Sequence, residues 1–330
     1  MKISFFSSQP YDITFFEKVN IDYQHELTFH EYSLNDDTVD LVKEVICICV
    51  FVNDKLNPSV LEKLYKKGVR LVALRCAGFN NIDLHTADKL GITVVRVPAY
   101  SPESVAEHTV GLMLSLSRHI HRAYNRVRES NFSLNGLLGF ELNHSTVGIV
   151  GTGQIGTVLA KILTGFGSRI IACDPVPNDK CIEMGVEYVD FITLCQQADV
   201  ISLHCPLTPD TQHLINKITL QDMKQGVMII NTSRGAVIDT EAVIGALKNK
   251  HIGYLGLDVY EQEENLFFKD LSEQIISDDL FERLLTFPNV LVTGHQAFFT
   301  DQALTNIAET TLNNIKRFEN NNECLHCCHI

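Results

Sequence analysis

Short apolar runs alternate along the chain with segments whose apolar residues have helical spacing. In the first hundred residues these runs predict strands at 2–6, 45–50, 70–76 and 93–97. Two segments between them, near 59–67 and 84–90, predict helices. Continuous runs rich in β-branched residues are typical of parallel strands covered on both faces. This part of the chain is therefore predicted to form a small α/β unit.

A long helix is predicted next, from about Ser101 to Ser130, with Ser101 as its N-cap and Pro102 at its first position. Proline is favoured there because the amide hydrogen that it lacks would have no partner within the helix. The apolar residues of this segment recur at spacings of three, four and seven: Val105, Leu112, Leu116, Ile120, Ala123 and Val127. One helix face should therefore be buried, and a second subunit is one candidate for the surface that covers it.

The second part of the chain repeats the alternation of strands and helices. Its apolar runs predict strands at 146–150, 169–173, 200–205, 227–231, 254–259 and 290–292. Six strands with helices between them are the count of a doubly wound dinucleotide-binding fold. A last helix, near 302–318, would return to the first unit and make that unit discontinuous.

We therefore predict a two-domain α/β protein with doubly wound parallel sheets, in agreement with the two domains that a length of 330 residues favours. One domain is a Rossmann dinucleotide-binding domain at 101–298. The other is a smaller, flavodoxin-like substrate domain at 1–100 and 299–330.

The composition narrows the partners of the chain. A net charge of −13 with dispersed Lys and Arg argues against nucleic acid or an anionic membrane as a partner. No apolar run is long enough to span a membrane or to form a signal-peptide core. Several of the ten cysteines, such as Cys47 and Cys173, lie in apolar runs where a reduced thiol behaves as a small hydrophobe. A cytoplasmic protein is expected.

A glycine-rich motif follows the first strand of the second part. Gly151, Gly153 and Gly156 form G-x-G-x-x-G between an apolar run and a helical segment. These glycines permit a tight turn, close approach of the backbone to pyrophosphate, and close helix packing. Asp174 ends the next strand, eighteen residues after Gly156, where an acid binds the adenosine ribose. Because an acid repels a 2′-phosphate, NAD is favoured over NADP.

Three polar residues lie at or just beyond the ends of later strands: Arg234, Glu263 and His295. Side chains at the carboxyl ends of parallel strands meet at one edge of the sheet. Reduction of a ketone requires a proton donor, a cation for the substrate carboxylate, and a group that keeps the donor charged. His295, Arg234 and Glu263 fit these roles in turn, although Glu261 and Glu264 compete for the role of Glu263.

The chain resembles the D-isomer-specific 2-hydroxyacid dehydrogenases over residues 1 to about 320. The resemblance rests on V-G-I-V-G-T-G-Q-I-G with Asp174, on the motif around Arg234, on Asp258 followed five residues later by Glu263, and on His295. It implies that Arg234 binds the substrate carboxylate and carbonyl, and that Glu263 pairs with His295, the acid/base. The sequence T-G-H-Q-A-F and an extra segment at 265–281 resemble the fermentative D-lactate branch of the family.

The same resemblance implies the binding residues. Those expected at the cofactor are Gly151, Gly153, Gln154, Ile155, Gly156, Asp174, Cys205, Pro206, Thr232, Ser233 and Asp258. Those expected at the substrate are Ala77, Gly78, Tyr100, Arg234 and Phe298, with Phe299 as a further part of the pocket wall. The backbone amides of Ala77 and Gly78 would hold the carboxylate.

The expected reaction is the reversible, NADH-dependent reduction of pyruvate to D-lactate by a homo-oligomer, either dimer or tetramer. Two alternatives stay open: a reductase of bulkier 2-keto acids such as phenylpyruvate, and an NAD-sensing protein like the corepressors that resemble this family. No metal is expected. The tail residues Cys324, His326, Cys327, Cys328 and His329 are potential ligands, but they lack a second pair to complete a site. His108 is expected to be a packed helix-face residue or a subunit contact, and His119 and His121 are expected to be solvated.

Overall fold

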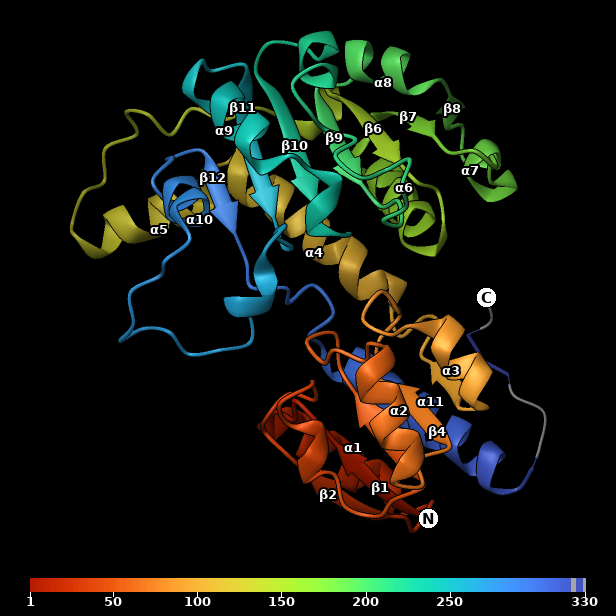
Figure 1. Ribbon diagram of the computed structural model, residues 1–330. Helices are drawn as coiled ribbons and strands as arrows, with labels where there is room; N and C mark the ends of the chain where they lie inside the picture. Colours follow the sequence, from red (N-terminus) through yellow and green to blue (C-terminus); the bar gives the residue numbers. More distant parts are fainter. Residues whose placement is uncertain (322–324, 329–330) are drawn as a thin grey trace. The chain divides into compact units, whose positions relative to one another are not determined.

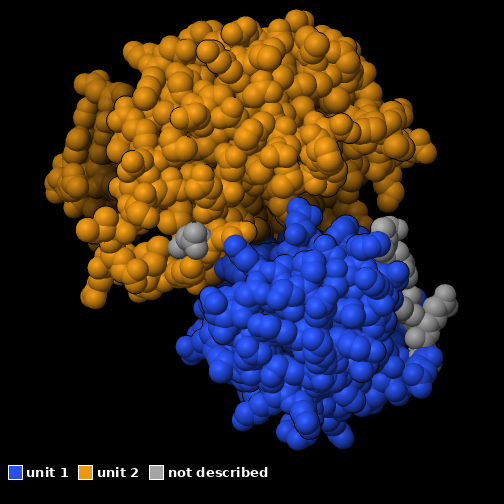
Figure 2. All heavy atoms as spheres, in the orientation of Figure 1, with its two compact units in different colours: residues 1–101, 298–330 blue, residues 102–297 orange. Residues whose placement is uncertain are grey.

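The computed structural model of the protein describes residues 1–321 and 325–328, and it confirms the predicted α/β class (Figure 1). The chain forms two compact units. Unit 1 comprises residues 1–101 and 298–330, and unit 2 comprises residues 102–297 (Figure 2).

Unit 1 contains a parallel sheet of five strands in the order β2-β1-β3-β4-β5. The strands are β1 (Lys2–Phe5), β2 (Glu26–Phe29), β3 (Cys47–Val50), β4 (Leu71–Leu74) and β5 (Thr93–Arg96). The helices are α1 (Pro10–Asn20), α2 (Pro58–Lys66), α3 (Leu84–Leu90) and α11 (Asp301–Glu319), with a 3₁₀ turn η1 (Val39–Leu41). Every residue of β3 and β4 is buried, as continuous apolar runs require.

Helix α1 and strand β2 were not predicted from the sequence. The strand β2 has the sequence E-L-T-F, lies at the edge of the sheet and alternates between exposed and half-buried residues. Such a short polar edge strand has no continuous apolar run to reveal it. Helix α1 buries only Asp12 and Phe16, so its amphipathic pattern is weak.

The tail pairs with the edge strand β5 and is not simply an extension after the last helix. The amide of Arg96 donates to the carbonyl of His326 at 3.1 Å, and the amide of Cys328 donates to the carbonyl of Val94 at 2.9 Å. Cys327 is disulfide-bonded. Cys324 and His329 lie outside the described residues, so the predicted absence of a metal site in the tail is not tested. Across 1–321 and 325–328, no three His, Cys, Asp or Glu side chains are grouped to hold a metal ion.

Unit 2 contains a parallel sheet of seven strands in the order β12-β11-β10-β9-β6-β7-β8. The strands are β6 (Thr146–Val150), β7 (Arg169–Cys173), β8 (Glu187–Tyr188), β9 (Val200–Leu203), β10 (Val227–Asn231), β11 (Ile252–Leu257) and β12 (Val290–Val292). The two-residue strand β8 was not predicted, because it is too short to form an apolar run. In register, Asn231 pairs with Leu257 and Leu257 pairs with Val292, so β10, β11 and β12 end at one edge.

The helices of unit 2 cover both faces of this sheet (Figure 1). They are α4 (Pro102–Ser117), α5 (Ile120–Arg128), α6 (Gln154–Phe166), α7 (Asp179–Glu183), α8 (Phe191–Gln197), α9 (Thr240–Lys248) and α10 (Asp279–Leu285). Four 3₁₀ turns complete the unit: η2 (Leu142–His144), η3 (Thr219–Asp222), η4 (Gly235–Val237) and η5 (Glu263–Asn265). None of the helices in the described part of the chain has the length and apolar content needed to cross a membrane.

The predicted helix from Ser101 to Ser130 is wrong in one respect, because it is broken in two. His119 has φ 53°, a left-handed conformation that ends α4 before α5 begins. His119 is buried, not solvated, and its Nε2 contacts the carbonyl oxygen of Leu138 at 3.2 Å. The predicted apolar stripe is buried at Leu112 and Leu116 in α4, whereas α5 has no buried residue.

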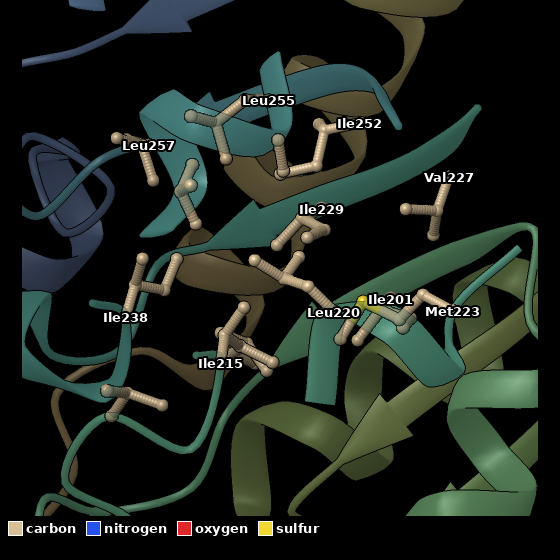
Figure 3. Packing of buried hydrophobic residues seen from close by; sticks show 14 of the residues in the cluster. Ile201, Ile215, Leu220, Met223, Val227, Ile229, Ile238, Ile252, Leu255 and Leu257 are labelled. Carbon is tan, nitrogen blue, oxygen red and sulfur yellow. The ribbon is translucent and has the colours of Figure 1, made fainter. Parts of the chain in front are cut away.

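A continuous apolar core supports the sheet of unit 2. Figure 3 shows side chains from three neighbouring strands packed together, among them Ile201, Ile229 and Leu255, all fully buried. On the opposite face of the sheet, α4 packs closely against β11 because Gly256 of β11 has no side chain. A Cβ atom on Gly256 would lie 3.2 Å from Leu116 Cδ1 and 2.7 Å from Ile230 Cδ1.

Candidate active site

The glycine motif forms the turn between β6 and α6. Gly151 has φ +95°, and a Cβ there would lie 2.8 Å from the backbone of Cys205. A Cβ on Gly156 would lie 2.0 Å from the carbonyl oxygen of Gly151. Gly153 is the N-cap of α6, where no side chain caps the helix, and beyond its chain neighbours nothing lies within 4 Å of the position of a Cβ atom. The uncapped amides of Gln154 and Ile155 therefore fit the pyrophosphate of a dinucleotide.

Asp174 follows β7 and lies against this turn. Its Oδ2 accepts hydrogen bonds from the Thr152 amide at 2.7 Å and the Thr152 hydroxyl at 3.2 Å, and its Oδ1 accepts from the Val176 amide at 2.9 Å. A carboxylate offers about four acceptor positions, so capacity remains for a ribose hydroxyl. The carboxylate is thus fixed beside the glycine turn, as ribose binding requires.

Substituting Asp174 with Ala should narrow the preference for NADH over NADPH, because the variant lacks the carboxylate that repels the 2′-phosphate of NADPH. We expect a change of about tenfold or more in the ratio of kcat/KM values, which corresponds to about 1.4 kcal/mol. The measurement is kcat/KM for both cofactors in wild type and variant. Asp190, an exposed N-cap of α8, offers a control in Asp190→Ala, which should not change the ratio. A wild type that uses both cofactors equally well would contradict the role of Asp174.

The loop after β9 carries Cys205 and Pro206, both predicted at the cofactor. Desolvation lowers the pKa of the neighbouring His204 to about 4, and its Nε2 lies 2.8 Å from the hydroxyl of Ser202. Desolvation also raises the pKa of the Cys205 thiol to about 11. Both side chains are therefore uncharged near neutral pH.

Arg234 lies in the loop that follows β10. The buried Asn231 shapes this loop, because its Nδ2 donates to the Arg234 carbonyl at 2.9 Å and its Oδ1 accepts from the Ser233 amide at 3.0 Å and the Ser233 hydroxyl at 2.8 Å. The guanidinium donates to the Ser233 carbonyl at 2.7 Å. Within 1–321 and 325–328, no carboxylate pairs with this guanidinium, which suits it to a substrate carboxylate.

The arginine loop lies against the segment that follows β11. A Cβ on Gly235 would lie 2.1 Å from the backbone of Tyr260, so only glycine allows this approach. The amide of Tyr260 in turn donates to Glu263 Oε2 at 2.9 Å. The arginine loop and the segment that carries Glu263 are therefore packed together at the same edge of the sheet.

His295 and Glu263 form a hydrogen-bonded pair. Glu263 Oε1 lies 2.8 Å from His295 Nδ1, and both side chains are about one-fifth exposed, at 20% and 19%. The ring of Phe268 lies 5.6 Å from the imidazole. A carboxylate at this distance orients the ring and fixes which nitrogen faces away from it.

The three competing acids differ in their surroundings. Glu261 Oε1 lies 2.5 Å from His213 Nε2, and its Oε2 accepts from the Thr240 hydroxyl at 3.0 Å. Glu264 is exposed. Glu263 is the acid that is bonded to the imidazole of His295.

Asp258, predicted to be at the cofactor, lies beneath the segment that carries His295. It is 1% exposed, and its carboxylate accepts from the Thr293 hydroxyl at 2.5 Å and from the amides of Gln296 and Ala297 at 2.9 and 2.8 Å. Its carbonyl oxygen accepts from the His295 amide at 2.7 Å. Asp258 therefore fixes the backbone on both sides of the histidine.

The other predicted substrate residues belong to unit 1. Ala77 and Gly78 follow β4, and the Ala77 carbonyl accepts from Arg96 Nη1 at 2.7 Å. The ring of Tyr100 lies 6.1 Å from that of the buried Phe298, and Phe51, which the sequence analysis did not single out, lies 6.2 Å from Phe298. Phe299 is 50% exposed. The predicted substrate residues therefore fall into two sets: Ala77, Gly78, Tyr100 and Phe298 belong to unit 1, and Arg234 belongs to unit 2.

A doubly wound parallel sheet with a glycine turn, an acid at the end of the next strand and a paired histidine at the strand ends is typical of nicotinamide-dependent dehydrogenases. The NAD-binding-domain model of the D-isomer specific 2-hydroxyacid dehydrogenases matches residues 110–297. The chain belongs to the D-isomer specific 2-hydroxyacid dehydrogenases, which confirms the predicted family, and NAD is their cofactor.

The chain is similar to characterised relatives over almost all of its length. It is 52% identical over 324 residues to D-lactate dehydrogenase of Escherichia coli (strain K12), covering 98% of each chain. The apo structure of D-lactate dehydrogenase from Escherichia coli matches with a TM-score of 0.91 and 50% identity, covering 100% of both chains. D-lactate dehydrogenase from Aquifex aeolicus, complexed with NAD and lactic acid, matches with a TM-score of 0.87 and 37% identity, covering 97% of this chain and 96% of that one.

Proposed function

We propose that the protein is a D-lactate dehydrogenase that reversibly reduces pyruvate to D-lactate with NADH. The observation that carries the proposal is the 2.8 Å pair of His295 and Glu263 at the strand ends of an NAD-binding sheet. The names of the relatives at 52% and 37% identity support the choice of substrate.

The residues of unit 2 divide the chemistry among them. NADH, when bound, supplies a hydride to the carbonyl carbon of the substrate. His295 donates a proton to the carbonyl oxygen, and because its Nδ1 is bonded to Glu263, Nε2 is the donor atom. Glu263 orients the imidazole through its contact with Nδ1. Arg234 binds the substrate carboxylate with two parallel hydrogen bonds and polarises the carbonyl.

Unit 2 is, in this proposal, the NAD domain and unit 1 the substrate domain. The amides of Ala77 and Gly78 bind the carboxylate, the Tyr100 hydroxyl assists, and Phe298 limits the size of the substrate side chain. The proposed cofactor contacts are the sequence-predicted ones: Gly151, Gly153, Gln154, Ile155, Gly156, Asp174, Cys205, Pro206, Thr232, Ser233 and Asp258.

Steady-state kinetics with pyruvate and phenylpyruvate discriminate the alternatives. We expect a higher kcat/KM for pyruvate, because in this proposal the aromatic ring of Phe298 forms the wall beside the substrate side chain. A preference for phenylpyruvate would indicate the reductase of bulkier acids. NAD binding without turnover of either acid would indicate the NAD-sensing protein.

We also propose that the enzyme is a homo-oligomer in the cytoplasm. Helix α5 exposes the apolar side chains of Ile120, Tyr124 and Val127, and the segment 129–141 exposes Phe132, Leu134 and Leu138, of which Leu138 is 91% exposed. Soluble monomers rarely present so many large apolar side chains together. A second copy of the chain is the occupant that we assign to this surface. Eight cysteines among the described residues are free thiols, as a reducing cytoplasm favours, and Cys327 is disulfide-bonded.

The double substitution Leu134→Asp and Leu138→Asp should convert the oligomer to a monomer, because a buried charge at each position opposes association. Light scattering coupled to gel filtration measures the change. Ile275→Asp is the matched control, since Ile275 is an equally apolar side chain that is 96% exposed outside this surface. A wild type that is monomeric at micromolar concentration would contradict the proposal.

A further inference from the structure

The first turns of α4 contact the segment that carries His295. Ser104 and His108 lie four residues apart, so they share one helix face. The Ser104 hydroxyl donates to the Ala297 carbonyl at 2.8 Å. His108 Nε2 lies 3.1 Å from the Thr293 hydroxyl and 3.4 Å from Asp258 Oδ1. Both ends of the segment 293–297 are therefore tied to α4.

The conformation of His295 itself needs such support. Its φ is 52°, in the left-handed region that residues with a Cβ atom rarely adopt. A backbone of this kind persists only where the surroundings determine it. The amide of His295 donates to the Asp258 carbonyl at 2.7 Å, and the side chain of Asp258 accepts from the amides of the next two residues.

His108 completes the surroundings of this buried carboxylate. Desolvation alone would raise the pKa of Asp258, but hydrogen bonds from His108, from Thr293 and from the two amides outweigh it and lower that pKa. Asp258 is therefore an anion near neutral pH, and the His108 imidazole is the ring that α4 places beside it. The His108 side chain is 21% exposed, so filling the apolar core is not its principal role.

We propose that His108 is a positioning residue for the proton transfer: through Thr293 and Asp258 it holds segment 293–297 in the conformation that presents His295 to the substrate. This inference rests on the proposed role of His295 as the acid. Proton transfer tolerates little displacement of the donor, and a shift of about 1 Å can reduce a rate by about 10²-fold.

The substitution His108→Leu tests the inference, because leucine has a similar volume but no ring nitrogen. We expect kcat for pyruvate reduction to fall by about 10- to 100-fold. KM for pyruvate should change little, because the Arg234 loop is not altered. NADH affinity, measured by fluorescence titration, should also be unchanged.

Two variants separate positioning from general destabilisation. His108→Gln keeps an amide donor for the Thr293 hydroxyl and should recover most of kcat. His251→Leu makes the same substitution at a half-buried histidine that precedes β11, at the end of the strand opposite Asp258, and should retain wild-type kcat. A His108→Leu enzyme with wild-type kcat, or equal losses in the Leu and Gln variants, would overturn the inference.

A double-mutant cycle distinguishes this inference from the proposed function. In a His295→Asn background, His108→Leu should cause almost no further loss, because it acts through His295. Losses that multiply would show that His108 acts elsewhere and would overturn the inference alone. A His295→Asn enzyme with wild-type kcat would instead overturn the proposed role of His295, and with it the basis of this inference.

Discussion

Substituting His295 with Asn should lower kcat for pyruvate reduction by about 10²- to 10⁴-fold, the typical contribution of a general acid. Asparagine keeps a polar group of similar reach but cannot donate a proton to the developing alkoxide. KM for pyruvate should change much less, since the histidine acts only as the oxygen gains charge. Steady-state kinetics at several pH values measure both parameters. Retention of wild-type kcat would contradict the assignment of His295 as the acid.

Glu263 should be recognised by a loss of kcat in the same reaction. The Glu263 carboxylate lies 2.8 Å from His295 Nδ1, so it orients the ring and leaves Nε2 as the donor atom. Glu263→Gln replaces a charge-assisted hydrogen bond, worth about 1.5–3 kcal/mol, with a neutral one, so kcat should fall by about tenfold or more while KM for pyruvate changes little. Glu261→Gln is the matched control, because Glu261 is bonded to His213 and Thr240. Equal kcat for wild type and Glu263→Gln would show that Glu263 does not position the acid.

Substituting Arg234 with Gln should raise KM for pyruvate and also lower kcat. A guanidinium binds the carboxylate in ground and transition states alike, and in the transition state it also polarises the carbonyl. Two charge-assisted hydrogen bonds are worth about 1.5–3 kcal/mol each, so kcat/KM should fall by about 10²- to 10⁴-fold.

Arg234→Lys should recover little of this loss, because lysine keeps the charge but lacks the planar fork that binds two oxygens. NADH affinity is the control and should be unchanged in both variants. An Arg234→Gln enzyme with wild-type KM would contradict carboxylate binding by Arg234.

The pattern of apolar runs predicted the parallel strands well, because buried parallel strands such as β3, β4 and β10 are apolar throughout. It failed where an element has no such run. The edge strand β2 is short and partly polar, and β8 has only two residues. The break between α4 and α5 was not visible either, since an apolar stripe continues through His119 although the backbone there is left-handed.

The sequence singled out Arg234, Glu263 and His295 because each has a distinctive side chain next to a strand end. It favoured Glu263 over Glu261 and Glu264 only through the resemblance, because the three acids are separated by only one to three positions. That choice depends on which carboxylate the chain turns toward the imidazole. The supporting contacts of Asp258 and Asn231 were also missed, because they are mostly hydrogen bonds to backbone groups and follow from the loop conformation.

The handedness of the product tests the central proposal most directly. Pyruvate would be reduced to completion with NADH by the wild-type enzyme, and the lactate enantiomers would then be separated on a chiral column, with the His295→Asn enzyme as the control for uncatalysed reduction. We expect pyruvate to be consumed with one NADH per molecule and nearly all of the product to be D-lactate. L-lactate as the main product, or NADH that is bound but not oxidised in the presence of pyruvate, would contradict the central proposal.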